Sequence, residues 1–287
     1  MTEKEWLNNN QLSIDIWSKK YQNNSETLEE WFNRISGNYS QLRNLIVSKK
    51  FLFGGRILAN RGVTGRKVTY SNCYVITPPE DNIESIFECA SKLARTYSYG
   101  GGCGTDLSNL RPHGARVNNA AKSSDGPVSF MEFFSQVTHT ICQGSRRGAL
   151  MLSMDINHPD IEEFIDCKTD LSKVNFANIS VKVNDAFMKA VEEDYDYFLN
   201  WPCGARDYNI LLDCPYNKLQ TTESIGGEPR YYKRVRARDI FNKLVKNNWD
   251  YAEPGILYWD RISEYNLLDN TDFKYAGVNP CRPMCTA

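Results

Sequence analysis

Cysteine is the residue type with the widest chemistry in this chain, which has nine cysteines among 287 residues. A thiol can give up a hydrogen atom or join another thiol in a disulfide, because sulfur tolerates several redox states. The cysteines form no C-x-x-C pair, and the N-terminus shows no basic segment followed by an apolar one. We therefore expect reduced thiols and no disulfide framework. The nine are Cys73, Cys89, Cys103, Cys142, Cys167, Cys203, Cys214, Cys281 and Cys285.

Several of these cysteines lie in or beside short segments rich in glycine, asparagine and arginine. In chain order the segments are Ser71-Asn72-Cys73-Tyr74-Val75-Ile76, Tyr97-Ser98-Tyr99-Gly100-Gly101-Gly102-Cys103-Gly104, Gln143-Gly144-Ser145-Arg146-Arg147-Gly148-Ala149, Glu253-Pro254-Gly255-Ile256-Leu257-Tyr258 and Asn279-Pro280-Cys281. The glycine cluster gives the backbone room for the close approach of a ligand, but it lacks the lysine of a phosphate-binding loop. By itself, Asn279-Pro280 is typical of a turn.

In this order the segments resemble the catalytic subunit of ribonucleotide reductases, the enzymes that make deoxyribonucleotides. The resemblance covers roughly residues 45 to 281 and is strongest to the adenosylcobalamin-dependent (class II) branch. It implies that a thiyl radical abstracts hydrogen from the ribose C3′, after which water leaves from C2′. It also implies that Cys281 is the radical site and that Asn279 hydrogen-bonds the substrate hydroxyls. Cys73 would be the first cysteine of the reducing pair, with its partner in the family's second half.

The same resemblance implies a substrate site and an effector site. The substrate-binding positions would be Arg56, Asn72, Cys73, Gly102 and Asn279. A deoxynucleotide or ATP effector would bind at Asp81, Arg111 and Lys122, because an aspartate suits ribose hydroxyls and an arginine suits phosphate. Residues 110–122 would form the first specificity loop. In the second loop, residues 143–148, Gln143 and Arg147 would read the identity of the effector. No metal site is implied.

The sequence departs from the family's pattern just after Cys281. The family's carboxylate, a proton acceptor at the 3′-hydroxyl, should stand at position 283, but Pro283 has no ionisable group and cannot act as a general base. The residues from Arg282 to Ala287 resemble nothing that follows the motif in the family. We therefore expect the N-terminal part of an enzyme that is inactive alone, with the second half supplied by another chain or by a continuation of the gene.

The resemblance also implies the cofactors and partners. The cofactors would be adenosylcobalamin and a nucleoside triphosphate effector. The partners would be a ribonucleotide substrate, as a di- or triphosphate, a thioredoxin-type reductant, a chain with the complementary half and, in a homodimer, a second copy.

Hydrophobic periodicity predicts the helices that would position these residues. Thr27-Leu28-Glu29-Glu30 and Ser129-Phe130-Met131-Glu132 have the spacing of capping boxes at helix starts. Residues 83–97 have the pattern of one amphipathic helix. Asp239 is expected to cap a helix whose apolar stripe is Ile240, Phe241, Leu244, Val245 and Trp249. Cys89 and Cys167 lie on helix-like patterns and are expected to be small buried hydrophobes.

Short apolar or alternating runs at residues 149–154, 179–183 and 255–259 predict strands between these helices. Alternation of this kind predicts an α/β fold with a mostly parallel sheet covered by helices. The resemblance implies the first half of a ten-stranded α/β barrel after a short helical N-terminal region. The expected domains are residues 1–45, the N-terminal helical region with a loosely held polar lead-in at 1–24, residues 46–278, the half-barrel, and residues 279–287, the start of the finger loop that carries the radical cysteine.

The charge of the chain is nearly balanced, with 34 basic and 35 acidic residues. This balance argues against an electrostatic nucleic-acid binder. No segment approaches the apolar length of a membrane span. We therefore expect a soluble, cytoplasmic protein that binds neither nucleic acid nor membrane.

Three alternatives remain open from the sequence. The chain could be the same half of a di-iron-type (class I) large subunit, although the lack of a preceding ATP-cone domain favours the cobalamin branch. It could be a non-catalytic nucleotide-binding fragment. It could also be a metal protein that uses Cys281 and Cys285 with Cys203 or Cys214, but Cys-x3-Cys without a nearby histidine is a poor zinc pattern.

Overall fold

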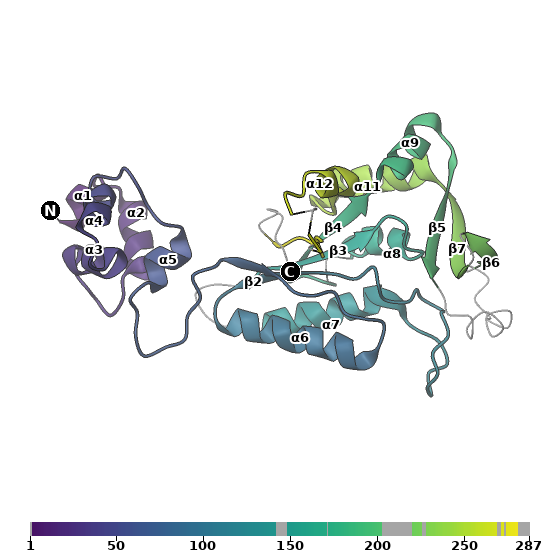
Figure 1. The fold of residues 1–287 in the computed structure, drawn as a ribbon, viewed down its shortest axis with the longest axis horizontal. Helices are drawn as coiled ribbons and strands as arrows, with labels where there is room; N and C mark the ends of the chain where they lie inside the picture. Colours follow the sequence, from purple (N-terminus) through teal and green to yellow (C-terminus); the bar gives the residue numbers. More distant parts are fainter. Residues whose placement is uncertain are drawn as a thin grey trace. The chain divides into compact units, whose positions relative to one another are not determined.

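The computed structural model describes residues 2–141, 148–170, 172–202, 220–225, 228–268, 271–272 and 274–280. The chain forms two compact units (Figure 1). The first contains Met1–Asn72 with Tyr99–Gly101, and the second contains Cys73–Ser98 with Gly102–Ala287. In the described part of the chain, no helix is long and apolar enough to cross a membrane.

The first unit consists of short helices around a cluster of tryptophan rings. Trp6 packs edge-on against Trp31 and Phe32, with ring centroids 5.8 and 5.2 Å apart, and Trp17 packs against Trp31 at 6.3 Å. The expectation of a loosely held lead-in is therefore wrong, because two buried indoles fix this otherwise polar segment. The helices are α1 (Glu3–Trp6), α2 (Gln11–Ile16), the π-helix η1 (Trp17–Tyr21), α3 (Leu28–Ser36), α4 (Ser40–Val47) and α5 (Gly55–Asn60).

The start of α3 is as predicted, because Thr27 and Glu30 form a capping box. The first unit extends beyond residue 45, where we expected it to end, because α5 also belongs to it. Leu58 of α5 packs in the aromatic core. Arg34 of α3 donates hydrogen bonds to the carbonyl oxygens of Leu58 and Arg61, at 3.4 and 2.5 Å.

A five-stranded parallel sheet forms the centre of the second unit. Its strands are β1 (Cys73–Val75), β2 (Gly102–Asp106), β3 (Leu150–Asp155), β4 (Ala177–Val183) and β8 (Gly255–Tyr258), in the order β1-β2-β3-β4-β8. The connecting helices include α6 (Ile83–Ser98), α7 (Gly126–Ile141), α8 (Ile161–Asp166), α9 (Asp185–Glu193) and α11 (Ala237–Tyr251), and α12 (Trp259–Glu264) follows β8. The fold class is therefore α/β with a parallel sheet, as the alternating pattern predicted.

The two faces of this sheet differ in polarity. One face carries the apolar residues of β3 and β4, such as Leu152 and Val181, and packs on side chains from α6, α7, α8, α9 and α11 in a single core. On the opposite face, the strand register aligns Asp106 with Ser153 and Ser180, and Asp155 with Lys182. We call this second face the polar face.

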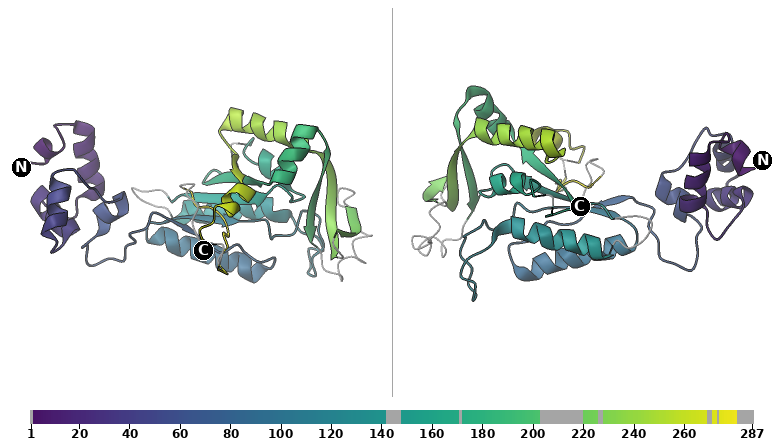
Figure 2. Two further views of the ribbon diagram at one scale, coloured as in Figure 1. Left: turned by 45° about the horizontal axis from the view of Figure 1, so that its top comes forward. Right: turned by 180° about the vertical axis from the view of Figure 1, so that it is seen from behind.

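A second, antiparallel sheet was not predicted. It has the order β5-β7-β6, from β5 (Asp196–Pro202), β6 (Gln220–Ile225) and β7 (Glu228–Arg236) (Figure 2). It lies between α9 and α11 in the chain, and in β5 the large side chains of Tyr197, Leu199 and Trp201 recur at every second residue, a strand signal that we did not use.

Two helix starts differ from the predictions. The helix α7 begins at Gly126, so Ser129 lies inside it and donates to the Gly126 carbonyl oxygen instead of capping. The helix α11 begins at Ala237, so Asp239 lies in its first turn. The predicted stripe of α11 is correct for Ile240 and Leu244, but Trp249 is 87% exposed.

Candidate functional site

The segment Gly277–Pro280 lies on the polar face, across β2. A Cβ atom on Gly104 would overlap the carbonyl oxygen of Val278, and one on Gly102 would lie 3.5 Å from the Cγ atom of Pro280. A Cβ atom on Gly277 would lie 3.8 Å from that of Asp106. The segment therefore runs antiparallel to β2. Asn279 is buried within it, with 1% of its surface exposed.

This packing explains the glycine at position 104. Gly102 and Gly104 face the same side of the strand, but only at Gly104 would a Cβ atom collide with the crossing backbone, whereas at Gly102 it would lie 3.3 Å from the Ala149 carbonyl oxygen and in ordinary contact with Pro280. The sequence suggested that the glycine cluster would approach a ligand. In the structure, the groups nearest Gly102 are Ala149 and Pro280 of the same chain.

Three predicted site residues come together on this face. Cys73 of β1 is the register partner of Gly102 in β2, and Gly102 contacts the residue that follows Asn279. Cys73, Gly102 and the segment containing Asn279 therefore lie on adjacent strands or directly against them. The other predicted cysteine of this site, Cys281, lies outside the described residues, as do Gln143 and Arg147.

The structure places Arg56 and Asn72 in the first unit. Within that unit, a Cβ atom on Gly100 would lie 2.8 Å from Nη1 of Arg56. Their role as substrate neighbours stays a prediction.

Cys73 is disulfide-bonded, so the expectation of reduced thiols is wrong for this residue. The other described cysteines, Cys89, Cys103 and Cys167, are free thiols. Burial raises the pKa of the Cys89 thiol, and it raises the pKa of Cys167 to about 12, so both are packing groups and poor nucleophiles.

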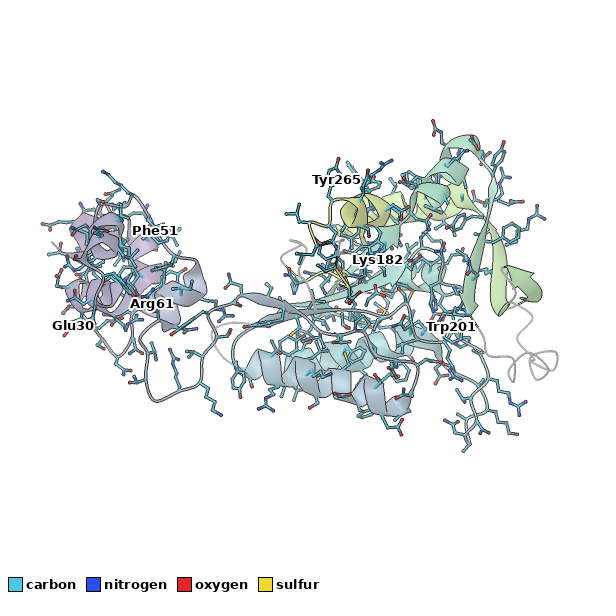
Figure 3. All side chains as sticks on the ribbon, viewed as in Figure 1. Glu30, Phe51, Arg61, Lys182, Trp201 and Tyr265 are labelled. Carbon is cyan, nitrogen blue, oxygen red and sulfur yellow. The ribbon has the colours of Figure 1, made fainter. Side chains whose placement is uncertain are left out.

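A buried ion pair that we did not predict lies at the end of β2 on the polar face. The ammonium group of Lys182, which is labelled in Figure 3, is 2.9 Å from Oδ2 of Asp106. The two side chains are only 9% and 4% exposed. The Ser153 hydroxyl donates to the same oxygen at 2.7 Å, and the amide of Ser108 donates to Oδ1 at 3.1 Å. Lys182 also lies over the ring of Trp259, 4.9 Å from its centroid.

The sequence contained a signal for this pair that we did not use. Lys182 stands between two buried valines of β4, where a charged side chain needs a buried partner. The neighbouring Asp155 has a raised pKa because it is buried, and the charge of Lys182 partly offsets that effect. The Ser180 hydroxyl on the same face is buried and makes no hydrogen bond to any described group.

Two of the three predicted effector residues, Asp81 and Arg111, line a separate cavity of about 620 Å³. Asp81 and Arg111 form one wall, joined by a 2.7 Å ion pair and by a 2.9 Å hydrogen bond from the Arg111 amide to the Asp81 carboxylate. Nη1 of Arg111 donates to the carbonyl oxygen of Arg116 at 2.5 Å. Lys122 lies on the same loop, but it is not one of the lining residues.

The other walls of this cavity are of two kinds. Asn118, Asn119, Ser123 and Ser124 present polar groups from the loop after Arg111. The helices α6 and α7 present apolar side chains, among which the rings of Phe87 and Phe133 lie 5.0 Å apart. A cavity with a cationic group, several hydrogen-bonding groups and an aromatic wall can hold a phosphorylated, ring-containing ligand.

The described residues contain no group of three or more histidine, cysteine or acidic side chains arranged to hold a metal ion. The cysteines of the zinc alternative, Cys203, Cys214, Cys281 and Cys285, lie outside the described ranges. That alternative therefore stays a sequence-level hypothesis.

Comparison with known proteins identifies the family. Residues 71–284 match the family model of the ribonucleotide reductase barrel domain. A vitamin B12-dependent ribonucleoside-diphosphate reductase of Thermoplasma acidophilum is 33% identical over 265 residues, which is 89% of this chain and 31% of that protein. The reductase of the same name from Mycobacterium tuberculosis is 30% identical over 253 residues, which is 88% of this chain and 32% of that protein.

A more distant relative is the large subunit of the ribonucleoside-diphosphate reductase of variola virus. It is 24% identical over 249 residues, which is 85% of this chain and 31% of the viral protein. The chain thus spans about a third of the length of these relatives. Because the family match covers most of the chain, and two relatives are at least 30% identical, the chain belongs to the ribonucleotide reductase barrel-domain family.

Proposed function

We propose that this chain is the first part of a ribonucleotide reductase, an enzyme that converts ribonucleotides to deoxyribonucleotides by thiyl-radical chemistry for DNA synthesis. The observation that carries the proposal is the packing of Gly277–Pro280 on Gly102 and Gly104. It brings Asn279 against the strand next to Cys73, although about 200 residues separate them in the sequence.

The proposed reaction replaces the 2′-hydroxyl of the ribose with hydrogen. A thiyl radical at Cys281 takes hydrogen from C3′, the hydroxyl leaves C2′ as water, and hydrogen is returned to C3′ from the Cys281 thiol. A dithiol made of Cys73 and a second cysteine supplies two electrons and two protons and becomes a disulfide. A thioredoxin-type reductant then restores the dithiol. In this proposal Asn279 orients the substrate hydroxyls, and Pro283 cannot act as the proton acceptor at the 3′-hydroxyl.

The five-stranded parallel sheet would be one half of a ten-stranded barrel. Its polar face would be the barrel interior, which explains why one face carries Asp106, Asp155 and Lys182 while the opposite face packs on helices. Barrel closure removes the exposed edges of a sheet. The strands that close this one would come from further sequence of the same protein or from a second chain.

The cavity beside Asp81 and Arg111 would bind a deoxynucleoside triphosphate or ATP as an effector. The guanidinium group of Arg111 suits phosphate, Asp81 suits ribose hydroxyls, and the Phe87–Phe133 wall suits stacking with a base. Phe87 is 55% exposed, so a second copy of the chain could cover this wall in a homodimer. The assignment of Lys122 as a phosphate contact depends on its flexible side chain reaching the ligand from outside the cavity lining.

Adenosylcobalamin enters the proposal through the names of the relatives, which are called vitamin B12-dependent at 33% and 30% identity. The described residues themselves do not fit a corrin ring. The effector cavity is lined by the ion pair and phenylalanines described above, and a smaller hollow of about 430 Å³ is lined by six residues of β8, α12 and Tyr265. When bound in the complete enzyme, this cofactor would generate the radical. The first part of a di-iron-type (class I) large subunit is the alternative, and the viral relative at 24% identity is named a large subunit.

Nucleotide binding by the full chain tests the effector assignment. We expect each deoxynucleoside triphosphate that binds to raise the melting temperature, by mass action on the folded state. Calorimetry with the Arg111→Ala variant should show roughly tenfold or greater weakening, because a charge-assisted contact to phosphate is lost. Arg95→Ala is the matched control, since Arg95 is exposed on α6 and does not line the cavity.

Two results would count against this assignment. Equal binding by the wild type and Arg111→Ala would show that Arg111 does not contact the nucleotide. No binding by the wild type to any deoxynucleotide would reject the effector site in this chain.

A further inference from the structure

The loop from Leu110 to Gly126, which supplies most of the polar wall of the effector cavity, is held at its base by the turn between β3 and α8. His158 of this turn bonds through Nε2 to the carbonyl oxygen of Leu110, at 2.8 Å. Oδ2 of Asp160 accepts a hydrogen bond from the backbone amide of His113, at 2.7 Å. The turn is therefore hydrogen-bonded to the chain on both sides of Arg111, at Leu110 and at His113.

The far end of the loop meets the same carboxylate. Gly126 has a φ of +77°, and a Cβ atom there would lie 2.7 Å from Oδ2 of Asp160 and 2.9 Å from the amide nitrogen of His113. Glycine is thus required on both steric and conformational grounds. The entry and the exit of the loop converge on one carboxylate.

The geometry of Asp160 indicates that this contact is not incidental. Asp160 stands at the N-cap of α8, where an aspartate normally accepts a hydrogen bond from the helix itself, but its side chain makes no capping bond. Instead, Nδ1 of His158 accepts a hydrogen bond from the backbone amide of Asp160, at 3.1 Å, which orients the turn. The carboxylate of Asp160 then faces the loop, where it accepts the bond from His113. Both side chains are buried, with His158 2% exposed and Asp160 9% exposed.

We propose that His158 and Asp160 are positioning residues for nucleotide binding, because they fix the base of the loop that carries Arg111. This inference rests on the proposed function of the cavity as an effector site. Arg111 is tied to Asp81 on one side of the cavity and, through Leu110 and His113, to the His158–Asp160 turn. The turn follows β3 directly, so its hydrogen bonds connect the loop to the central sheet.

The hydrogen bonds from the His158–Asp160 turn determine how much conformational entropy the loop must lose when a ligand binds. A loop whose base is fixed presents Arg111 and the polar wall in a nearly binding-competent arrangement. If the base is released, the loop samples other arrangements, and the apparent affinity falls by the fraction of time spent in the competent one. Asp160 and His158 are not among the residues that line the cavity, and they bond to Leu110 and His113 on either side of Arg111, so we expect their effect on binding to pass through the loop.

The test combines hydrogen–deuterium exchange with nucleotide titration on the full chain. In Asp160→Ala, the loop amides from Arg111 to Asp125 should exchange faster, and affinity for a deoxynucleoside triphosphate should fall about tenfold, the size of one lost charge-assisted hydrogen bond. Asp160→Asn keeps an acceptor oxygen and should restore most of both properties. Gly126→Ala, which crowds the carboxylate from the loop side, should reproduce the defect without altering Asp160.

The matched control is Glu163→Ala, which removes an exposed carboxylate one helical turn away. It should leave loop exchange and affinity unchanged. Unchanged loop exchange in both Asp160→Ala and Gly126→Ala would overturn the proposal, and so would faster exchange with unchanged affinity. If the wild-type chain binds no nucleotide, the proposed effector function fails, and the exchange data still decide whether His158 and Asp160 hold the loop.

Discussion

At the scale of single residues, the Asp106–Lys182 pair shows how the polar face tolerates charge. Both groups are almost fully buried, yet each oxygen of Asp106 accepts a hydrogen bond or an ion-pair contact, and Lys182 adds a contact to an aromatic ring. A buried pair is costly to desolvate, and removal of one partner leaves an uncompensated charge. We therefore expect the loss of one partner to lower the stability of the fold more than the replacement of both partners together.

We predict that Lys182→Met lowers the free energy of unfolding by roughly 3–5 kcal/mol, because the Asp106 carboxylate is left buried without its cation. The double variant Asp106→Asn/Lys182→Met should recover a large part of this loss. Denaturant unfolding of both variants measures the difference. Lys173→Met removes a lysine of the exposed pair with Asp170 and should change stability little. A double variant as unstable as the single one would show that Lys182 acts mainly by packing.

Asp160 and His158 should give opposite dependences of stability on pH. Burial raises the pKa of Asp160 to about 6, with Glu163 raising it further and His113 and Lys233 lowering it. The folded state then holds a proton that the unfolded chain has lost, so this contribution to stability is present below about pH 4 and is lost as pH rises through 6. Burial lowers the pKa of His158 to about 4, with Leu110 and Asp106 acting in the opposite direction. Its contribution is present above about pH 6.5 and is lost as pH falls through 4.

Between pH 4 and 6 these two contributions to the free energy of unfolding change with pH in opposite directions. We therefore expect the His158–Asp160 turn to add little net pH dependence to the stability of the wild type. Asp160→Asn removes one of these contributions, so its unfolding free energy should rise from pH 4 to pH 6.5 relative to the wild type, by up to about 3 kcal/mol. Parallel denaturant titrations at pH 4, 5, 6 and 7 measure the difference. If the free energies of unfolding of the wild type and Asp160→Asn differ by the same amount at every pH in this range, the pKa of Asp160 is not raised.

At the scale of elements, the packing of Gly277–Pro280 depends on the absence of side chains in β2. We predict that Gly104→Ala displaces this segment, because the added Cβ atom overlaps the Val278 carbonyl oxygen, which is backbone and cannot rotate away. The cost should be about 1–3 kcal/mol, as for other overpacked sites. Hydrogen exchange should become faster at residues 277–279.

The control for this substitution is Gly54→Ala, since a Cβ atom on Gly54 would meet nothing within 4 Å. That variant should leave exchange in the segment unchanged. If Gly104→Ala also leaves it unchanged, the segment does not lie across β2 as described.

The helices and strands that could be predicted are those whose hydrophobic periodicity and hydrogen bonds involve only residues close in sequence. The helix at 83–97, the strands at 149–154 and 179–183, and the capping box at Thr27 depend on local periodicity and local hydrogen bonds, and the structure confirms them. The start of α7 and the packing of Trp6 and Trp17 depend on groups far away in sequence, so propensity alone could not fix them.

The same distinction applies to the site. The motifs led us to expect site roles for Cys73, Gly102, Asn279, Asp81 and Arg111, and these residues divide between the polar face and the cavity beside Arg111. The crossing of Gly104 by a segment about 170 residues away leaves no local trace in the sequence and was not predicted, whereas the expected approach of a ligand to the glycine cluster stays a prediction. Sequence reasoning missed Lys182 because its partner, Asp106, lies on a different strand.

At the scale of the whole molecule, the five-stranded sheet ends in two edge strands, β1 and β8. Exposed aromatic side chains lie in β8 and in the segment after it, namely Tyr258 and Tyr265. Edge strands and apolar patches of this kind favour association. If the sheet is half of a barrel, the 287-residue chain should self-associate or bind a polypeptide that carries the complementary strands. A monodisperse monomer in analytical ultracentrifugation, with one cooperative melting transition, would argue against the half-barrel.

Catalysis should fail in the same chain even where nucleotide binding succeeds. The resemblance implies a proton-accepting carboxylate at position 283, where this sequence has proline, and the 287 residues span about a third of the length of relatives named as reductases. A radical on sulfur also has to be shielded from water and oxygen, which an open sheet does not provide. We therefore predict no deoxyribonucleotide from this chain with adenosylcobalamin, a dithiol and ribonucleotides. Product above the level of a Cys73→Ser control would show that the polar face alone encloses a working site, and the barrel assignment would have to be abandoned.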